Sequence, residues 1–190
     1  MIDYLIIGSG LAGIAFAETA MENHKSILVI DDAIPGASNV SAGLYNPVVL
    51  KRFTPLANAS EHLELLQAFY SRIETRLHCK INHPLPVLRR FSSIEEQNNW
   101  FIASDKTGLS PFLATKLITT KYQGIDSTFD FGRVKGTGYV NAPELLSRYK
   151  IDLQSKGLLI NEAFDHAQIE MTPGGIQYKQ IKAKHIIFAE

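Results

Sequence analysis

The sequence predicts an α/β protein with a parallel sheet, interrupted by a smaller inserted α+β unit. The first observation is a set of closely spaced glycines between an apolar run and an alanine-rich segment, near the start of the chain. The second is another apolar run that ends in an acidic pair, about 20 residues further on. The third is a change of pattern near Ile81, followed by a capped helix at Asn141. Together they indicate two segments of one domain that flank an insertion.

The glycines fall at a strand-to-helix turn. Tyr4–Ile7 is a short apolar run typical of a buried parallel strand, and Leu11–Met21 is rich in alanine, a good helix former. Between them, Gly8, Gly10 and Gly13 have G-x-G-x-x-G spacing. Glycine at such a turn permits a sharp bend, close approach of the backbone to a pyrophosphate, and tight packing of helix on strand. The N-terminus of the helix then offers free N–H groups to the anion.

A second strand strengthens this interpretation. Ser26–Ile30 is apolar and leads into Asp31, at the offset where an acid can accept hydrogen bonds from a ribose. Asp32 is the neighbouring rival, but side chains alternate along a strand, so it would be aimed elsewhere. The combination predicts a dinucleotide-binding unit with a Rossmann-like fold, whereas the glycines alone are also compatible with an ordinary turn.

A long loop, from Asp31 to Pro55, exceeds the length of an ordinary connection. Its middle holds small residues whose hydroxyl and backbone N–H groups could line a long dinucleotide beyond its first phosphate: Ser38, Asn39, Ser41, Ala42 and Gly43. A nicotinamide-binding fold would place a helix and a third parallel strand soon after the second strand. This loop does not follow that pattern, so the sequence favours FAD.

The next segments predict an amphipathic helix and then the insertion. Apolar residues recur at helical spacing from Leu63 to Leu77 behind Ser60, a suitable N-cap, and we interpret this stripe as core. The stretch LPVLRRF is strand-like, and Ser93 with Glu96 forms a capping box for a helix that runs through Trp100. The insertion ends with FDFGRVKGTGYVN, which indicates two strand-like pieces about a glycine-rich turn.

The first domain then resumes. Asn141 can cap a helix that has Pro143 in its first turn and runs to about Ser155. The remaining residues predict two strands, a Gly-Gly hairpin, a further strand, and an apolar final strand from Ile186 to Ala189.

The composition argues against several classes of function. The 190 residues include 19 Lys and Arg and 19 Asp and Glu, so the net charge is zero and no electrostatic field favours binding of nucleic acid or of an anionic membrane. Cys79 is the only cysteine, which excludes an internal disulfide and favours a reducing compartment, so we expect a cytoplasmic protein. We expect neither a signal peptide nor a membrane span, because the start lacks a basic region and no apolar run approaches about 20 residues. The close spacing of His78, Cys79 and His83 suggests a metal site, but no fourth ligand is evident. We therefore expect no metal ion there.

The chain resembles the FAD-dependent D-amino-acid oxidase, glycine oxidase and sarcosine oxidase superfamily. Four segments in the family's order carry the likeness: IIGSGLAG, VIDDAIPGASNVSAGLYNP, GTGYVNAPELLSRYKIDLQSKGLLI and KHIIFAE. The resemblance implies that Gly8, Ser9, Gly10 and Gly13 hold the pyrophosphate and that Asp31 holds the adenosine ribose. It further implies that the residues from Ser38 to Gly43 run along the pyrophosphate toward the flavin, and that the backbone near His166 meets the adenine. Ala189 matches the small residue that ends the family's final strand here.

The resemblance also implies a chemistry. In the family, a substrate amine gives a hydride from its α-carbon to the flavin, and no acid–base dyad is required, so no catalytic residue is assigned. A basic residue near the position of Lys51 and Arg52 lies close to the flavin and the substrate carboxylate in sarcosine-oxidase-like members; both residues could equally be solvated loop charges. Family members have about as much chain again beyond the end of this sequence, so we expect a truncated chain whose activity belongs to the full-length parent.

The predicted fold is therefore a Rossmann-like, glutathione-reductase-like FAD-binding domain, made of residues 1–80 and 141–190, with part of an α+β substrate domain inserted at 81–140. The predicted function is oxidation of a small amine or amino acid. One alternative is a flavin-dependent tRNA-modification oxidase, because the turn SAGLYNP resembles the oxidase half of bifunctional tRNA-modifying proteins, although zero net charge disfavours direct RNA binding. Another is a non-catalytic dinucleotide-binding module.

Within the insertion, Trp100 is expected to pack in the core, and Tyr139 either faces a substrate or pairs across strands.

Overall fold

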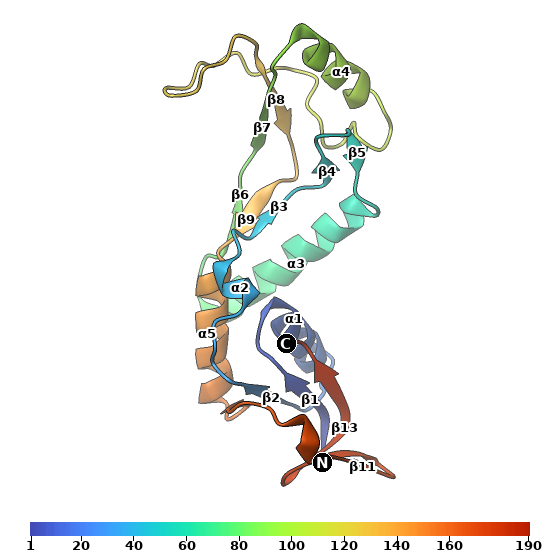
Figure 1. The fold of residues 1–190 in the computed structure, drawn as a ribbon, viewed down its shortest axis with the longest axis vertical. Coiled ribbons are helices and arrows are strands. Elements are labelled where there is room, and N and C mark those ends of the chain that lie inside the picture. Colours follow the sequence, from blue (N-terminus) through green and yellow to red (C-terminus); the bar gives the residue numbers. More distant parts are fainter. The chain divides into compact units, whose positions relative to one another are not determined.

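A computed structural model describes residues 1–190 and divides them into two compact units. The first unit comprises Met1–Ser41 and Asn141–Glu190, and the second comprises Ala42–Val140. Figure 1 shows the chain leaving the first unit after helix α2 (Ala37–Val40) and returning at helix α5 (Ala142–Ser155). Whether the units are an FAD-binding domain and part of a substrate domain stays a prediction.

The first boundary lies at Ser41 and not at residue 80, where the sequence analysis placed it. The reason is helix α3 (Ala59–Leu77), which belongs to the second unit. Its Leu63 packs against the apolar core of that unit, and its Glu74 carboxylate accepts the backbone N–H groups of Ile81 and Asn82 at 2.8 and 2.7 Å. The amphipathic stripe was visible in the sequence, but the partner of that stripe was not.

The first unit is built on a six-stranded sheet with the order β10-β2-β1-β13-β12-β11. Strands β1 (Ile2–Ile7), β2 (Ile27–Asp31), β10 (Leu159–Asn161) and β13 (Ile181–Phe188) pair in parallel. Strands β11 (Ile169–Thr172) and β12 (Gly175–Tyr178) extend the sheet as an antiparallel hairpin. The predicted α/β class with a parallel sheet is confirmed. The segment before β11 contains a 3-10 turn at His166–Gln168.

Helices α1 (Leu11–Glu22) and α5 contact each other as well as strands of the sheet. They are joined by a buried hydrogen bond in which the Tyr149 hydroxyl donates to the Glu18 carboxylate at 2.8 Å. Helix α5 begins as predicted, because the Asn141 side chain accepts the backbone N–H of Glu144 at 3.3 Å. Helix α1 contacts β1 and β2, whereas α5 contacts β10.

Side chains alternate between the two faces of this sheet, as the period of a strand requires. Leu5 and Ile7 of β1 form one core cluster with Tyr178 from the hairpin, and all three are almost fully buried. Between them, Ile6 points to the opposite face and is also fully buried. Burial on both faces explains why β1 is a continuous apolar run, as parallel strands usually are.

The second unit contains short antiparallel strands and two helices. Strands β3 (Leu44–Tyr45), β9 (Gly138–Val140) and β6 (Asn82–Pro84) form one sheet, and β4 (Val48–Val49) pairs with β5 (Thr54–Pro55). Strand β7 (Val87–Arg90) pairs with β8 (Phe131–Val134). The two strand-like pieces expected to end the insertion therefore exist as β8 and β9 but pair with other strands. Tyr139 pairs across strands, and its ring stacks on His83 at 4.8 Å.

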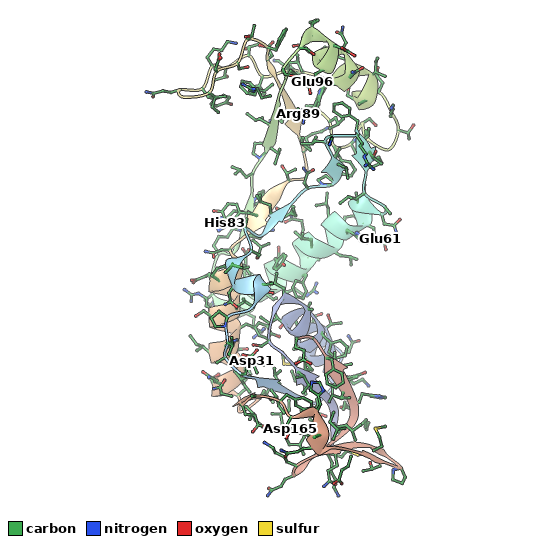
Figure 2. The ribbon with its side chains drawn as sticks, viewed as in Figure 1. Asp31, Glu61, His83, Arg89, Glu96 and Asp165 are labelled. Atoms are coloured by element: carbon green, nitrogen blue, oxygen red, sulfur yellow. The ribbon has the colours of Figure 1, made fainter.

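The core of the second unit surrounds Trp100 on helix α4 (Ile94–Ser104). Trp100 is fully buried, its indole N–H donates to the Ala114 carbonyl at 2.9 Å, and Phe53 and Phe91 pack against it edge to face. The expectation that Trp100 packs is confirmed. Figure 2 shows Glu96 of α4 beside Arg89 of β7, with which it forms an ion pair at 2.6 Å. The predicted cap at Ser93 forms, whereas α3 begins behind Asn58 and not behind Ser60.

Candidate dinucleotide site

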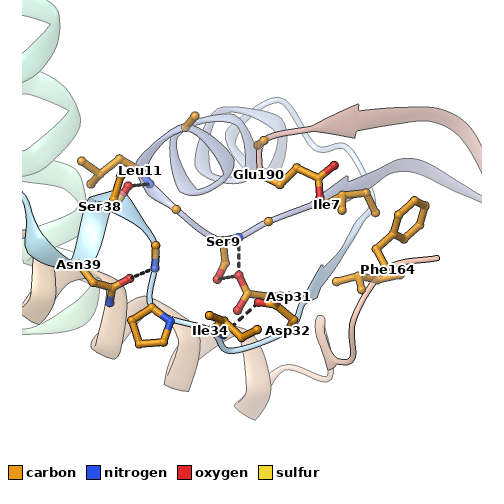
Figure 3. A pocket seen from close by; sticks show the side chains of 18 of the residues that line it. Ile7, Ser9, Leu11, Asp31, Asp32, Ile34, Ser38, Asn39, Phe164 and Glu190 are labelled. Carbon is orange, nitrogen blue, oxygen red and sulfur yellow. Dashed lines mark hydrogen bonds between the residues drawn. The ribbon is translucent and has the colours of Figure 1, made fainter. Parts of the chain in front are cut away.

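A cavity of about 490 Å³ lies in the first unit, where β1, β2, β10 and β13 end. In open α/β sheets, ligands bind at the carboxyl ends of the parallel strands, and this cavity occupies that position. Figure 3 shows the glycine turn along one side of it and the segment that contains Ser38 and Asn39 along another. The predicted residues that line it are Gly8, Ser9, Gly10, Asp31, Asp32, Ser38, Asn39 and Ala189.

Two glycines of the motif are required by close packing of the backbone. Gly8 has a φ of +95°, and a Cβ there would lie 2.7 Å from the Ala189 carbonyl oxygen of the neighbouring chain end. Gly13 lies on α1, where a Cβ would collide with the Gly8 carbonyl oxygen. Gly10 differs, because the closest atom to a Cβ there is the Ser38 hydroxyl at 3.2 Å. A side chain at Gly10 would therefore press on the Ser38 hydroxyl, whereas at Gly8 and Gly13 it would collide with backbone atoms.

The start of α1 faces this space. The first backbone N–H groups of a helix have no partner within the helix and carry a partial positive charge. One of them, the N–H of Leu11, donates to the Ser38 hydroxyl at 3.2 Å (Figure 3). The Asn39 side chain accepts the N–H of Gly36 at 3.1 Å and so fixes the turn that brings Ser38 to α1. The arrangement provides N–H and hydroxyl groups of the kind that bind phosphate.

Asp31 lies at the end of β2 and is bound to the glycine turn. Its Oδ2 accepts both the backbone N–H and the hydroxyl of Ser9 at 2.7 Å, as Figure 3 shows. Its Oδ1 accepts the N–H of Ala33 at 2.9 Å and the ammonium of Lys150 at 2.7 Å. Burial opposes ionisation of this carboxyl, but the hydrogen bonds from Lys150, Ser9 and Ala33 outweigh it and lower the pKa of Asp31 to about 2. Asp31 is therefore ionised at neutral pH.

Asp32 lines the same cavity but does not contact the glycine turn. Its Oδ1 accepts the backbone N–H of Ile34 at 3.0 Å, which closes a local turn. The expectation that strand alternation aims Asp32 elsewhere is wrong, because Asp32 follows the end of β2 and still lines the cavity; the two acids differ in their hydrogen bonds. The choice of Asp31 as the ribose acceptor stays a prediction.

The residues of the cavity that the sequence analysis did not identify include Lys150, Glu162, Phe164 and Glu190. Phe164 is the aromatic member, and its ring stacks on Tyr178 with centroids 4.4 Å apart. Lys150 comes from α5 and reaches Asp31 across 119 positions of sequence. No local pattern identifies such a contact; the resemblance of the α5 segment to the family was the only signal that this helix matters.

Other predicted residues lie outside the cavity lining. In the first unit, Gly13 packs against the glycine turn outside the cavity. The His166 ring stacks on Phe188, and its Nε2 lies 3.3 Å from a carboxylate oxygen of Glu190. Ser41 ends the first unit, and its hydroxyl donates to the Ser38 carbonyl at 3.1 Å. Ala42 and Gly43 belong to the second unit, where Gly43 packs against Val140. Their roles along a dinucleotide stay predictions.

Lys51 and Arg52 are exposed in the turn between β4 and β5 of the second unit. The Arg52 backbone N–H donates to the Val49 carbonyl at 3.1 Å and closes this turn, so the side chain projects from a hairpin end. A substrate role and a solvated loop charge both agree with this placement.

No set of three or more His, Cys, Asp or Glu side chains in the structure is arranged to hold a metal ion. His78, Cys79 and His83 follow or end α3, and His83 packs against Tyr139. None of the helices combines the length and the apolar character needed to cross a membrane.

No protein-family model matches the sequence. Solved structures do resemble the fold. L-amino acid deaminase from Proteus vulgaris matches with a TM-score of 0.73 and 14% identity, over 100% of this chain and 47% of that chain. Glycine oxidase from Geobacillus kaustophilus matches with a TM-score of 0.69 and 17% identity, over 99% of this chain and 55% of that one. Glycine oxidase from Bacillus cereus matches with a TM-score of 0.67 and 18% identity, over 100% of this chain and 55% of that one.

The chain spans about half the length of these structures. At such low identities the comparison establishes the fold and leaves substrate and activity open. The resemblance that the four sequence segments indicate is thus confirmed at the level of fold: this chain has the fold shared by glycine oxidase and L-amino acid deaminase.

Proposed function

We propose that the protein is an FAD-dependent oxidoreductase that oxidises a small amine or amino acid by hydride transfer to the flavin. The observation that carries this proposal is the meeting of the glycine turn, Asp31 and the start of α1 around one cavity. The named activities of the structural neighbours support the substrate class, since they include glycine oxidase, L-amino acid deaminase and iminodiacetate oxidase.

The cavity suits the adenosine and pyrophosphate end of FAD. Gly10 has no side chain to fill the cavity beside Ser38, and the start of α1 supplies N–H groups for a pyrophosphate. Asp31 is an ionised acceptor suited to ribose hydroxyls, and Phe164 offers an apolar ring to the adenine. The cavity volume of about 490 Å³ is within the range typical of small-molecule sites.

When bound, the flavin supplies the acceptor for the substrate hydride. The contribution of these residues is to hold the nucleotide end in one position, so that the rest of the cofactor is oriented. We further propose that Lys51 and Arg52 attract the substrate carboxylate, for which a guanidinium fork is suited to two parallel hydrogen bonds. This activity belongs to the full-length protein, because the chain covers about half of each neighbour.

The test is the absorption spectrum of the purified full-length protein, followed by anaerobic addition of single amino acids and small amines. We expect a bound flavin spectrum that is bleached by at least one of these compounds. Gly10→Val should lose the flavin, because its side chain enters the space beside Ser38. Gly174→Ala is the matched control, because a Cβ there meets no atom within 4 Å and Gly174 is outside the cavity.

Three outcomes would redirect the proposal. Flavin that no amine or amino acid bleaches would favour a non-catalytic binding module. Bleaching only by tRNA that carries a carboxymethylamino group would favour the tRNA-modification alternative. Retention of a nicotinamide nucleotide in place of flavin would contradict the assignment of the cofactor.

A further inference from the structure

The Asp31 carboxylate is already fully engaged by donors of the protein. An ionised carboxylate has about four acceptor positions, two on each oxygen. The Ser9 backbone N–H and hydroxyl bind Oδ2, and the Ala33 N–H and Lys150 ammonium bind Oδ1, at distances of 2.7 to 2.9 Å. A ribose hydroxyl that donates to Asp31 therefore has to replace one of these donors.

The four donors differ in how easily they can leave. The N–H groups of Ser9 and Ala33 belong to the backbone of the two turns that follow β1 and β2, so their removal would require both turns to move. The Ser9 hydroxyl is attached next to a backbone group that binds the same oxygen. Lys150 instead reaches Oδ1 through a flexible four-carbon stem, and its side chain is 27% exposed. It can withdraw toward solvent without any change in the backbone.

We propose that Lys150 holds the acceptor position on Asp31 that a nucleotide ribose takes, and that binding exchanges the ammonium for a ribose hydroxyl. This inference rests on the proposed function, in which Asp31 binds the ribose. Lys150 is then a positioning residue: it keeps the carboxylate ionised and oriented toward the cavity, and it weakens nucleotide binding by the free energy of its own ion pair.

A purely structural role for Lys150 predicts the opposite effect of its removal on nucleotide affinity, namely a decrease. If the ion pair only held α5 against β2, its removal would loosen the cavity and weaken every nucleotide equally. A role in attracting phosphate would also weaken every nucleotide of the same charge equally. Only exchange at Asp31 makes the effect of Lys150 depend on whether the ligand carries ribose hydroxyls.

The experiment measures dissociation constants of ADP and 2′,3′-dideoxy-ADP for full-length protein freed of flavin, by competition against FAD. The two ligands carry the same phosphates and differ only in the hydroxyls. The variant Lys150→Met keeps the apolar stem and removes the ammonium. Its ratio of the dideoxy-ADP dissociation constant to the ADP dissociation constant should be about five-fold higher than the wild-type ratio, a difference in binding free energy of about 1 kcal/mol. Lys156→Met is the matched control, because Lys156 is on the same helix and pairs with Asp152 at 2.8 Å outside the cavity.

Each result has one meaning. An unchanged or smaller ratio in Lys150→Met overturns the exchange, and so does a similar rise in Lys156→Met. Equal dissociation constants of ADP and 2′,3′-dideoxy-ADP in both wild type and Lys150→Met also overturn it, because the ribose hydroxyls would then contribute nothing. If the wild-type protein binds no FAD, the proposed function itself fails; if it binds FAD with an unchanged ratio, only the exchange fails. A thermal unfolding scan of each variant verifies that it is folded before binding is measured.

Discussion

Asp31→Asn should destabilise the first unit at neutral pH, and the effect should disappear in acid. The amide has nearly the shape of the carboxylate, but its NH₂ group must face two hydrogen-bond donors whichever way it is turned. These are either the two Ser9 groups or the Ala33 N–H and the Lys150 ammonium. The variant therefore loses the charge-assisted bonds and places donors against donors.

The pKa of Asp31 sets the size and the pH range of this effect. Hydrogen bonds lower the pKa in the folded protein from 3.8 to about 2, against the opposing effect of burial. Because the folded pKa lies below the unfolded one, ionised Asp31 stabilises the fold above pH 3.8, and this contribution is lost as the pH falls toward 2. The difference between the two pKa values corresponds to about 2 kcal/mol of unfolding free energy. This is an upper limit, because solvent and salt screen the interactions of the carboxylate.

The assay is urea unfolding of wild type and Asp31→Asn between pH 6 and about pH 2, followed by far-ultraviolet circular dichroism. Trp100 is the only tryptophan and lies in the second unit, so its fluorescence reports that unit separately. Asp32→Asn is the control, because Asp32 accepts only the N–H of Ile34 among the contacts described for it. A stability difference between wild type and Asp31→Asn that stays constant across the pH range would refute this reasoning.

Three further changes test other parts of the structure. Phe164→Leu should weaken FAD binding by about 1 kcal/mol, measured by flavin fluorescence, if its ring contacts the adenine; unchanged affinity would exclude that contact. Arg52→Lys should retain flavin but lower the limiting rate of bleaching by an amino acid in stopped flow, because the planar fork is lost; an unchanged limiting rate and half-saturation for Arg52→Ala as well would identify a solvated charge. Gly13→Ala should cost at least about 2 kcal/mol of unfolding free energy in urea, because its Cβ collides with the Gly8 carbonyl, while Gly174→Ala should cost less than half of that.

Local patterns allowed part of the site to be predicted. Gly8, Gly13 and the end of β2 are determined by the path of one strand–helix–strand segment, so their spacing in the sequence identifies them. The same holds for the cap at Asn141, whose side chain and its partner are separated by only a few residues.

Contacts between distant segments could not be predicted in this way. Lys150 and Phe164 reach the cavity because α5 and the segment after β10 return to the first unit, and nothing adjacent to them marks that return. The early boundary at Ser41 has a similar cause. An amphipathic pattern in α3 shows that one face is covered, but the identity of the covering residues depends on the tertiary fold.

The pairing of β1 with β13 has a consequence for the synthesis of the protein. Asp3 and Lys184, which form an ion pair at 2.7 Å, are 181 positions apart, whereas the second unit is one continuous segment. On the ribosome, all of Ala42–Val140 emerges before β13 exists. At roughly 5–20 residues per second, β1 waits on the order of ten seconds for this neighbour, with one edge unpaired. Of the two units, the first is thus completed later, and until then its nascent β1–β2 pair presents an unpaired edge of the kind that promotes aggregation.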